Sequence, residues 1–106
     1  NMATGNILAE GNTDRLKVIS VTFNANNVGA GATTTQSITV PGVLPGDFVY
    51  AIKPTDTPGY MVTGMRVTVA NTVQISAGNP TGLAADPGSE TWLFLVLRPD
   101  ATLTAF

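Results

Sequence analysis

Short apolar segments with a two-residue period recur along this chain, and clusters of glycine, proline and asparagine separate them. In residues 17–23, Ile19, Val21 and Phe23 fall on one face of an extended strand, while the residues between them point the other way. No segment repeats its apolar residues with helical spacing over three turns. The pattern therefore predicts an all-β protein.

Six strands are predicted from segments that are rich in β-branched or aromatic residues and are bounded by turn residues. They cover residues 16–23, 33–40, 48–53, 60–69, 73–77 and 91–97. Gly64, inside the fourth segment, indicates a β-bulge or the close approach of another segment. This pattern is typical of a single β-sandwich of jelly-roll-like type or of a barrel, and the sequence leaves both open.

The aromatic residues and the last predicted strand indicate where the core lies. Residues 92–97 form an unbroken apolar run, which is typical of a strand covered on both faces. Aromatic side chains within alternating strands usually belong to the core. By this rule we expect five aromatic residues to be core residues: Phe23, Phe48, Tyr50, Trp92 and Phe94.

The length of 106 residues is enough for one core and too short for two. We expect residues 16–106 to form this single domain and residues 1–15 to form an N-terminal arm. Ile7 and Leu8 are the large aliphatic residues of the arm. Because ordering a segment costs backbone entropy, we expect the arm to be mobile in the free protein and ordered only on assembly with a neighbouring chain.

The chain has no histidine and no cysteine, which removes the commonest general base, the commonest metal ligand and every disulfide. A serine nucleophile would have to rely on Lys17 or Lys53 as its base. Each of these lysines is expected to be solvated at a strand edge. We therefore expect no catalytic residues, no cofactor and no enzymatic activity.

The acidic residues lie mostly in turns, beside glycine or proline. Asp47 and Asp86 are expected to accept hydrogen bonds from the turn backbone rather than to act as a catalytic carboxylate pair. Asp86 and Glu90 share one loop, which raises the alternative of a calcium site. Calcium needs about six to eight oxygen ligands, and two carboxylates do not supply them, so we expect no metal site.

Charged residues make up only 11 % of the chain, and the net charge is −2. This balance provides no basic surface for nucleic acid. No stretch approaches the ~20 consecutive apolar residues of a membrane span, so we also expect no membrane partner. A free monomer usually carries more surface charge, which indicates that part of this surface is covered in the working protein.

Several turn motifs follow one another between residues 33 and 99. They are QSITVPGV (36–43), PGDFV (45–49), NTVQI (71–75), NPT (79–81), DPGSET (86–91) and VLRP (96–99). In this order they resemble small β-rich virion proteins of tailed bacteriophages, of the capsid decoration (cement) or head-fibre type.

The resemblance implies a capsid decoration protein that binds the capsid shell non-covalently and stabilises the head. The implied partners are the major capsid protein and further copies of this chain, as a homotrimer on the capsid surface of the virion. Ile7, Leu8 and Arg15 are then the candidate residues for contact with the capsid or with a neighbouring subunit.

Two further functions stay open from the sequence. One is a phage tail or fibre attachment domain, and the other is a bacterial adhesin-type β-domain; both would recognise a glycan or protein of a host surface. Glycan binding would require an exposed aromatic ring for stacking. Tyr60 and Trp92 are the candidates for that ring.

Overall fold

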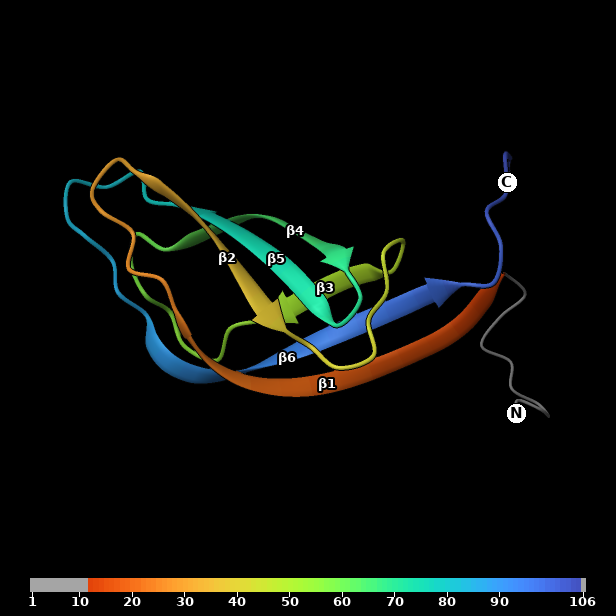
Figure 1. Cartoon of the computed structure of the whole chain (residues 1–106). Coiled ribbons are helices and arrows are strands. Elements are labelled where there is room, and N and C mark those ends of the chain that lie inside the picture. Colours follow the sequence, from red (N-terminus) through yellow and green to blue (C-terminus); the bar gives the residue numbers. More distant parts are fainter. Residues whose placement is uncertain (1–11, 106) are drawn as a thin grey trace.

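The computed structural model describes residues 12–105, which form six β-strands and no helix. The strands are β1 (Thr13–Ala25), β2 (Thr33–Thr39), β3 (Phe48–Ile52), β4 (Met61–Val69), β5 (Thr72–Gly78) and β6 (Gly88–Pro99). They form two antiparallel three-stranded sheets with the strand orders β1–β6–β3 and β2–β5–β4. Figure 1 shows the two sheets as layers, so the fold is a β-sandwich and the barrel alternative is excluded.

The core lies between the two layers and uses one side of each sheet. Trp92 and Phe94, on the central strand β6, are 1 % and 0 % exposed. The ring of Phe23 on β1 lies 4.8 Å from that of Trp92, and buried valines such as Val73 cover these rings from the second sheet. The prediction that Phe23, Trp92 and Phe94 belong to the core is confirmed.

A glutamine side chain joins the two sheets at the β1–β2 side of the sandwich. Gln36 of β2 accepts a hydrogen bond from the backbone N–H of Asn26 through its Oε1 atom, at 2.8 Å. Its Nε2 atom donates to the backbone carbonyl of Asn24, also at 2.8 Å. The side chain thus supplies hydrogen-bond partners to two backbone groups where the chain leaves β1.

The turn between β4 and β5 is held by Asn71, whose φ of 63° lies in the left-handed region. Its backbone N–H donates to the carbonyl of Val43 at 2.8 Å, and its carbonyl accepts from the N–H of Val40 at 3.0 Å. Its side-chain Oδ1 accepts from the N–H of Gly42 at 2.8 Å. These bonds fix the β2–β3 connection against the β4–β5 hairpin.

Asn79 is the buried polar residue that organises the loop between β5 and β6, and it is 2 % exposed. Its Nδ2 atom donates to the carbonyls of Val28 and Leu83, at 3.0 and 2.7 Å. Its Oδ1 atom accepts from both the N–H and the hydroxyl of Thr81. Gly59 packs so closely that a Cβ atom there would lie 2.8 Å from Oδ1 of Asn79, so this position requires glycine.

The six predicted strands are all present, and the bulge expected near Gly64 appears as a register shift between Val62 and Gly64. Strand β1 begins at Thr13, so residues 13–15 belong to a strand. Residues 92–97 are not covered on both faces, because Leu93 and Leu95 are 44 % and 41 % exposed. That prediction is wrong because the strand is central in its sheet but only one side of the sheet faces the core.

Candidate interaction surface

The outer side of the β1–β6–β3 sheet is lined by apolar side chains. The antiparallel register places them in three cross-strand rows, in which directly opposed residues point to the same side. The rows are Leu16–Leu97–Phe48, Val18–Leu95–Tyr50 and Ser20–Leu93–Ile52. We call the eight apolar members of these rows the outer apolar face.

The outer apolar face is open to solvent. Phe48 and Tyr50 are each 67 % exposed, and Val18 is 64 % exposed. The five other members are at least partly exposed as well: Leu16, Ile52, Leu93, Leu95 and Leu97. A typical monomer rarely exposes a contiguous apolar patch larger than a few hundred Å², which makes this face the leading candidate for an interaction surface.

The outer side of the other sheet is polar on two of its three strands. Strands β2 and β5 present hydroxyl and amide side chains there, including Thr35, Ser37 and Gln74, whereas the edge strand β4 exposes Met61 and Val69. Thr35 and Ser76 are within hydrogen-bond distance, with 3.4 Å between their hydroxyl oxygens. The two outer sides therefore differ, because apolar rows that run across all three strands lie on the β1–β6–β3 side.

An open groove with a volume of about 630 Å³ adjoins the outer apolar face at the edge strand β3. Phe48, Tyr50 and Leu95 line it from the outer apolar face. Met65 and Arg66 line it from β4, so the groove spans the gap between the two sheets. A cationic side chain thus stands beside two exposed aromatic rings.

The aromatic residues are arranged differently from the sequence expectation. Phe48 and Tyr50 were expected in the core, and that prediction is wrong, because Val49 and Ala51 turn inward instead. Trp92 is buried, which removes it as a stacking platform for a glycan. Tyr60 packs edge-on against Trp92 with 6.3 Å between ring centroids, and its half-buried position raises the pKa of its hydroxyl.

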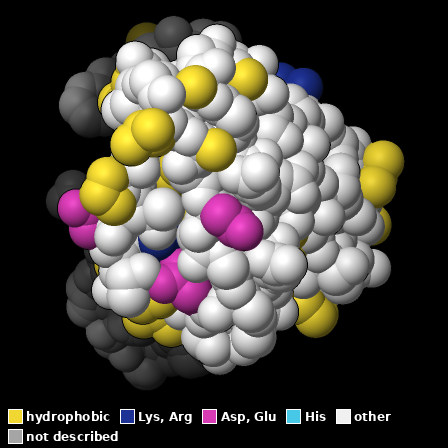
Figure 2. All heavy atoms as spheres, turned by 90° about the vertical axis from the view of Figure 1, so that its left-hand side faces the viewer, with side chains coloured by type: hydrophobic (Ala, Val, Ile, Leu, Met, Phe, Trp, Pro, Cys, Tyr) yellow, Lys and Arg dark blue, Asp and Glu magenta, His cyan; other side chains and the backbone are white. Residues whose placement is uncertain are grey.

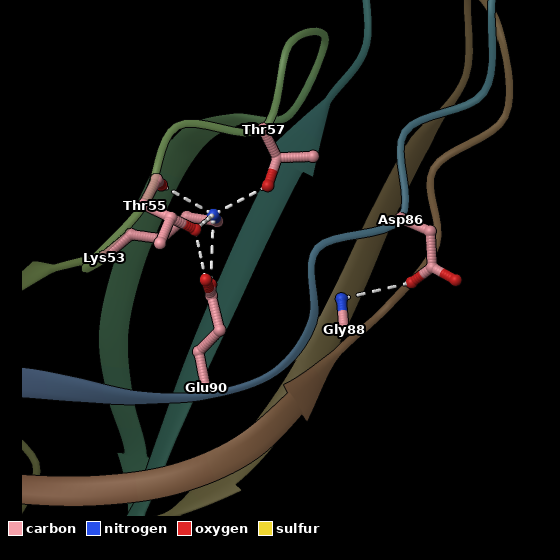
Figure 3. A network of polar contacts seen from close by, with 6 residues as sticks. All are labelled: Lys53, Thr55, Thr57, Asp86, Gly88 and Glu90. Carbon is pink, nitrogen blue, oxygen red and sulfur yellow. Dashed lines mark hydrogen bonds and ion pairs between the residues drawn. The ribbon is translucent and has the colours of Figure 1, made fainter.

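A polar network closes one end of the β1–β6–β3 sheet (Figure 3). Lys53 Nζ lies 3.0 Å from Glu90 Oε1 and donates to the hydroxyl of Thr57 at 2.7 Å. Thr55 donates its hydroxyl to Glu90 and accepts from Lys53 through its backbone carbonyl. The hydrogen bond from Thr55, followed by that from Lys53, lowers the pKa of Glu90, so the ion pair stays charged at neutral pH.

This network holds the β3–β4 connection onto β6. Lys53 is engaged by its three partners rather than solvated at an edge, and Lys17 is exposed on β1. Asp86 points away from Glu90 in Figure 3 and accepts from the N–H of Gly88 at 3.3 Å. Within residues 12–105 no group of three or more acidic side chains is placed to hold a metal ion.

A second ion pair ties the β2–β3 connection to the end of β6. Arg98 Nε and Nη2 each lie 2.8 Å from a carboxylate oxygen of Asp47, and Nη2 also donates to the carbonyl of Gly42. Asp47 accepts in addition from the N–H of Leu44, which is the turn role expected of it. The hydrogen bonds from Arg98 lower the pKa of Asp47.

Of the three candidate contact residues, the described structure includes Arg15. Ile7 and Leu8 lie outside the described residues. Arg15 is exposed on β1, one residue before Leu16 of the outer apolar face. Figure 2 views the loop end of the sandwich, where uncharged atoms dominate and charged side chains are few.

Comparison of the chain with protein-family models, with curated proteins and with solved structures found no match. Among residues 12–105, no helix is long and apolar enough to cross a membrane.

Proposed function

We propose that this protein is a structural component of a phage virion, a capsid decoration protein that binds the shell non-covalently. The observation that carries the proposal is the outer apolar face, an uncharged surface on one side of a sandwich whose other side is polar on strands β2 and β5. A protein that uses such a surface acts by burying it within an assembly.

The energy available from this surface is suited to assembly. Seven of its side chains are 41–67 % exposed. With about 150–200 Å² for each complete side chain, they present on the order of 700 Å². At ~25 cal/mol per Å², burying that area would contribute about 17 kcal/mol before the cost of association, which is itself about 4–15 kcal/mol. The balance favours a stable, reversible contact within an assembly.

The residues that carry the resemblance to virion proteins also support the proposal. Asp47, Asn71 and Asn79 stand in the shared motifs, and each fixes a connection between strands through several hydrogen bonds. The motifs thus specify this arrangement of turns. A protein with the same turns is expected to present its sheets in the same way.

The test uses virions of the phage whose genome encodes this chain. We expect mass spectrometry of purified particles to find the chain at a fixed copy number. Particles that lack it should rupture at a lower temperature, or under a smaller osmotic shock, than complete particles. Absence of the chain from purified virions would exclude the proposal, and equal rupture of both particle types would exclude the stabilising role.

Host attachment is a second candidate, because Phe48 and Tyr50 beside Arg66 form a groove that could stack a sugar ring. A tail-fibre or adhesin-type domain would use it in this way. Binding on a glycan array that Tyr50→Ala abolishes, and that Ser37→Ala leaves unchanged, would favour this candidate. Absence of binding on the array would argue against glycan attachment and favour the decoration role.

A further inference from the structure

We infer that the outer apolar face is covered by a second copy of this chain, with the two β1–β6–β3 sheets stacked face to face. The inference rests on the proposed function in one respect, namely that this face is buried in the working protein. It goes further in naming what buries the face.

The charge distribution favours a second copy over a different protein. None of the side chains in the three rows of the outer apolar face is charged. Selectivity for a foreign partner usually relies on complementary charges, and this face has none to offer. A neutral apolar face is complementary to itself, and a second copy of the chain always supplies it.

The size of the face fits the same conclusion. Two copies that each bury on the order of 700 Å² would bury roughly 1,400 Å² together, which lies within the range of about 1,200–2,000 Å² for specific interfaces. Sheets that pack face to face are separated by about 10 Å, with strands within about 30° of alignment. The core of this sandwich already uses that kind of packing.

The shape of the face indicates the orientation of the pair. Its β3 side carries Phe48, Tyr50 and Ile52, while its β1 side carries the smaller set of Leu16, Val18 and Ser20. A two-fold axis parallel to β6 places β3 of one copy over β1 of the other and brings Leu95 of both copies to the centre. Tyr50 of each copy then lies over Val18 of the other, Ile52 lies over Ser20, and Phe48 lies over Leu16.

The experiment measures the mass of the full chain in solution across 1–100 µM, by sedimentation velocity and native mass spectrometry. We expect the wild type to be a dimer of twice 10.9 kDa at 10 µM. Leu95→Asp, at the centre of the face, should raise the dissociation constant at least 100-fold. Ser37→Asp, exposed on the opposite sheet, should leave it within about two-fold, because that side of the sandwich is polar.

Folding of each variant is checked by circular dichroism and by the fluorescence of Trp92. Should Leu95→Asp fail to fold, Tyr50→Thr, at an edge position that is 67 % exposed, replaces it, with an expected loss of at least ten-fold in affinity. A wild type that stays monomeric at 100 µM would overturn the inference. So would a trimer, or a dimer that survives the substitution on the outer apolar face.

The two proposals fail separately. A monomer that is nevertheless found in virions would overturn the second-copy inference and leave the decoration role standing. A dimer that forms through this face but is absent from virions would support the second-copy inference and exclude the decoration role.

Discussion

Asn71 shows how much structure one residue can hold in this protein. Left-handed backbone is unfavourable for most residues and tolerated by glycine and asparagine. Here asparagine also supplies the Oδ1 atom that accepts from Gly42. The residue therefore combines a backbone role with a side-chain role, and two substitutions can separate them.

We expect Asn71→Gly to lose only the side-chain hydrogen bond, at a cost of about 0.5–1.5 kcal/mol. Asn71→Ala loses the same bond and adds left-handed strain of about 1–2 kcal/mol, so it should be the less stable of the two. Urea unfolding of both variants measures the difference. Equal midpoints would show that the turn relaxes to another conformation.

Asp47 predicts a dependence of stability on pH. Its pKa in the folded protein is lowered from 3.8, mainly by the hydrogen bonds from Arg98, so the charged form favours folding. This contribution is complete well above pH 3.8 and is lost as the pH falls through the lower pKa of the folded state. The urea midpoint of the wild type should therefore exceed that of Asp47→Asn at pH 7, and the gap should narrow below pH 3.8. A gap that stays constant down to pH 2.5 would contradict this role.

At the scale of elements, the two sheets are joined by side chains as well as by the core. Gln36 of β2 is the clearest example, because its side chain forms hydrogen bonds with the backbone of Asn24 and Asn26 at the end of β1, in the opposite sheet. Without it, the N–H of Asn26 and the carbonyl of Asn24 lose their partner. An unmade hydrogen bond in a partly buried position is costly.

We expect Gln36→Ala to lower the free energy of unfolding by about 1–3 kcal/mol. Ser37→Ala, the neighbouring residue on the exposed side of β2, should change it by less than about 0.5 kcal/mol. Hydrogen exchange should show the additional opening at residues 24–26. A loss of protection confined to β5 would contradict the bridging role.

At the scale of the whole molecule, one aromatic cluster serves both layers. Trp92 contacts Phe23 within its own sheet and Tyr60 at the start of β4, and its centroid lies 6.4 Å from that of Phe94. Because the two sheets share this core, neither sheet is expected to be stable without the other. The sandwich is expected to unfold as one cooperative unit.

Trp92→Ala should cost about 3–5 kcal/mol, a large part of the 5–15 kcal/mol that stabilises a typical domain. Leu83→Ala, at a position that is 79 % exposed, is the control and should be close to neutral. Circular dichroism in guanidinium chloride measures both. A small effect of Trp92→Ala would mean that the core closes around the lost ring.

The strands themselves could be predicted because alternation and turn residues are local properties. The six segments and the bulge near Gly64 follow from a two-residue period broken by glycine and proline. The side of the sheet that faces the core was harder to predict. In β3 both sides are apolar, with Phe48 and Tyr50 on one and Val49 and Ala51 on the other. Aromatic size favoured the wrong side.

The outer apolar face could not be predicted from the sequence for the same reason, namely that both sides of its strands carry apolar residues. Leu93 and Leu95 lie in an unbroken apolar run. Such a run is compatible with a strand that is buried on both sides, and also with a strand that has one buried side and one exposed apolar side. What the sequence by itself determined is the all-β class, the turns and the alternation, because each depends on neighbours a few residues apart. What only the tertiary structure decided is which side of each strand meets the other sheet. That depends on pairings between residues far apart in the chain, such as Thr13 of β1 with Pro99 of β6.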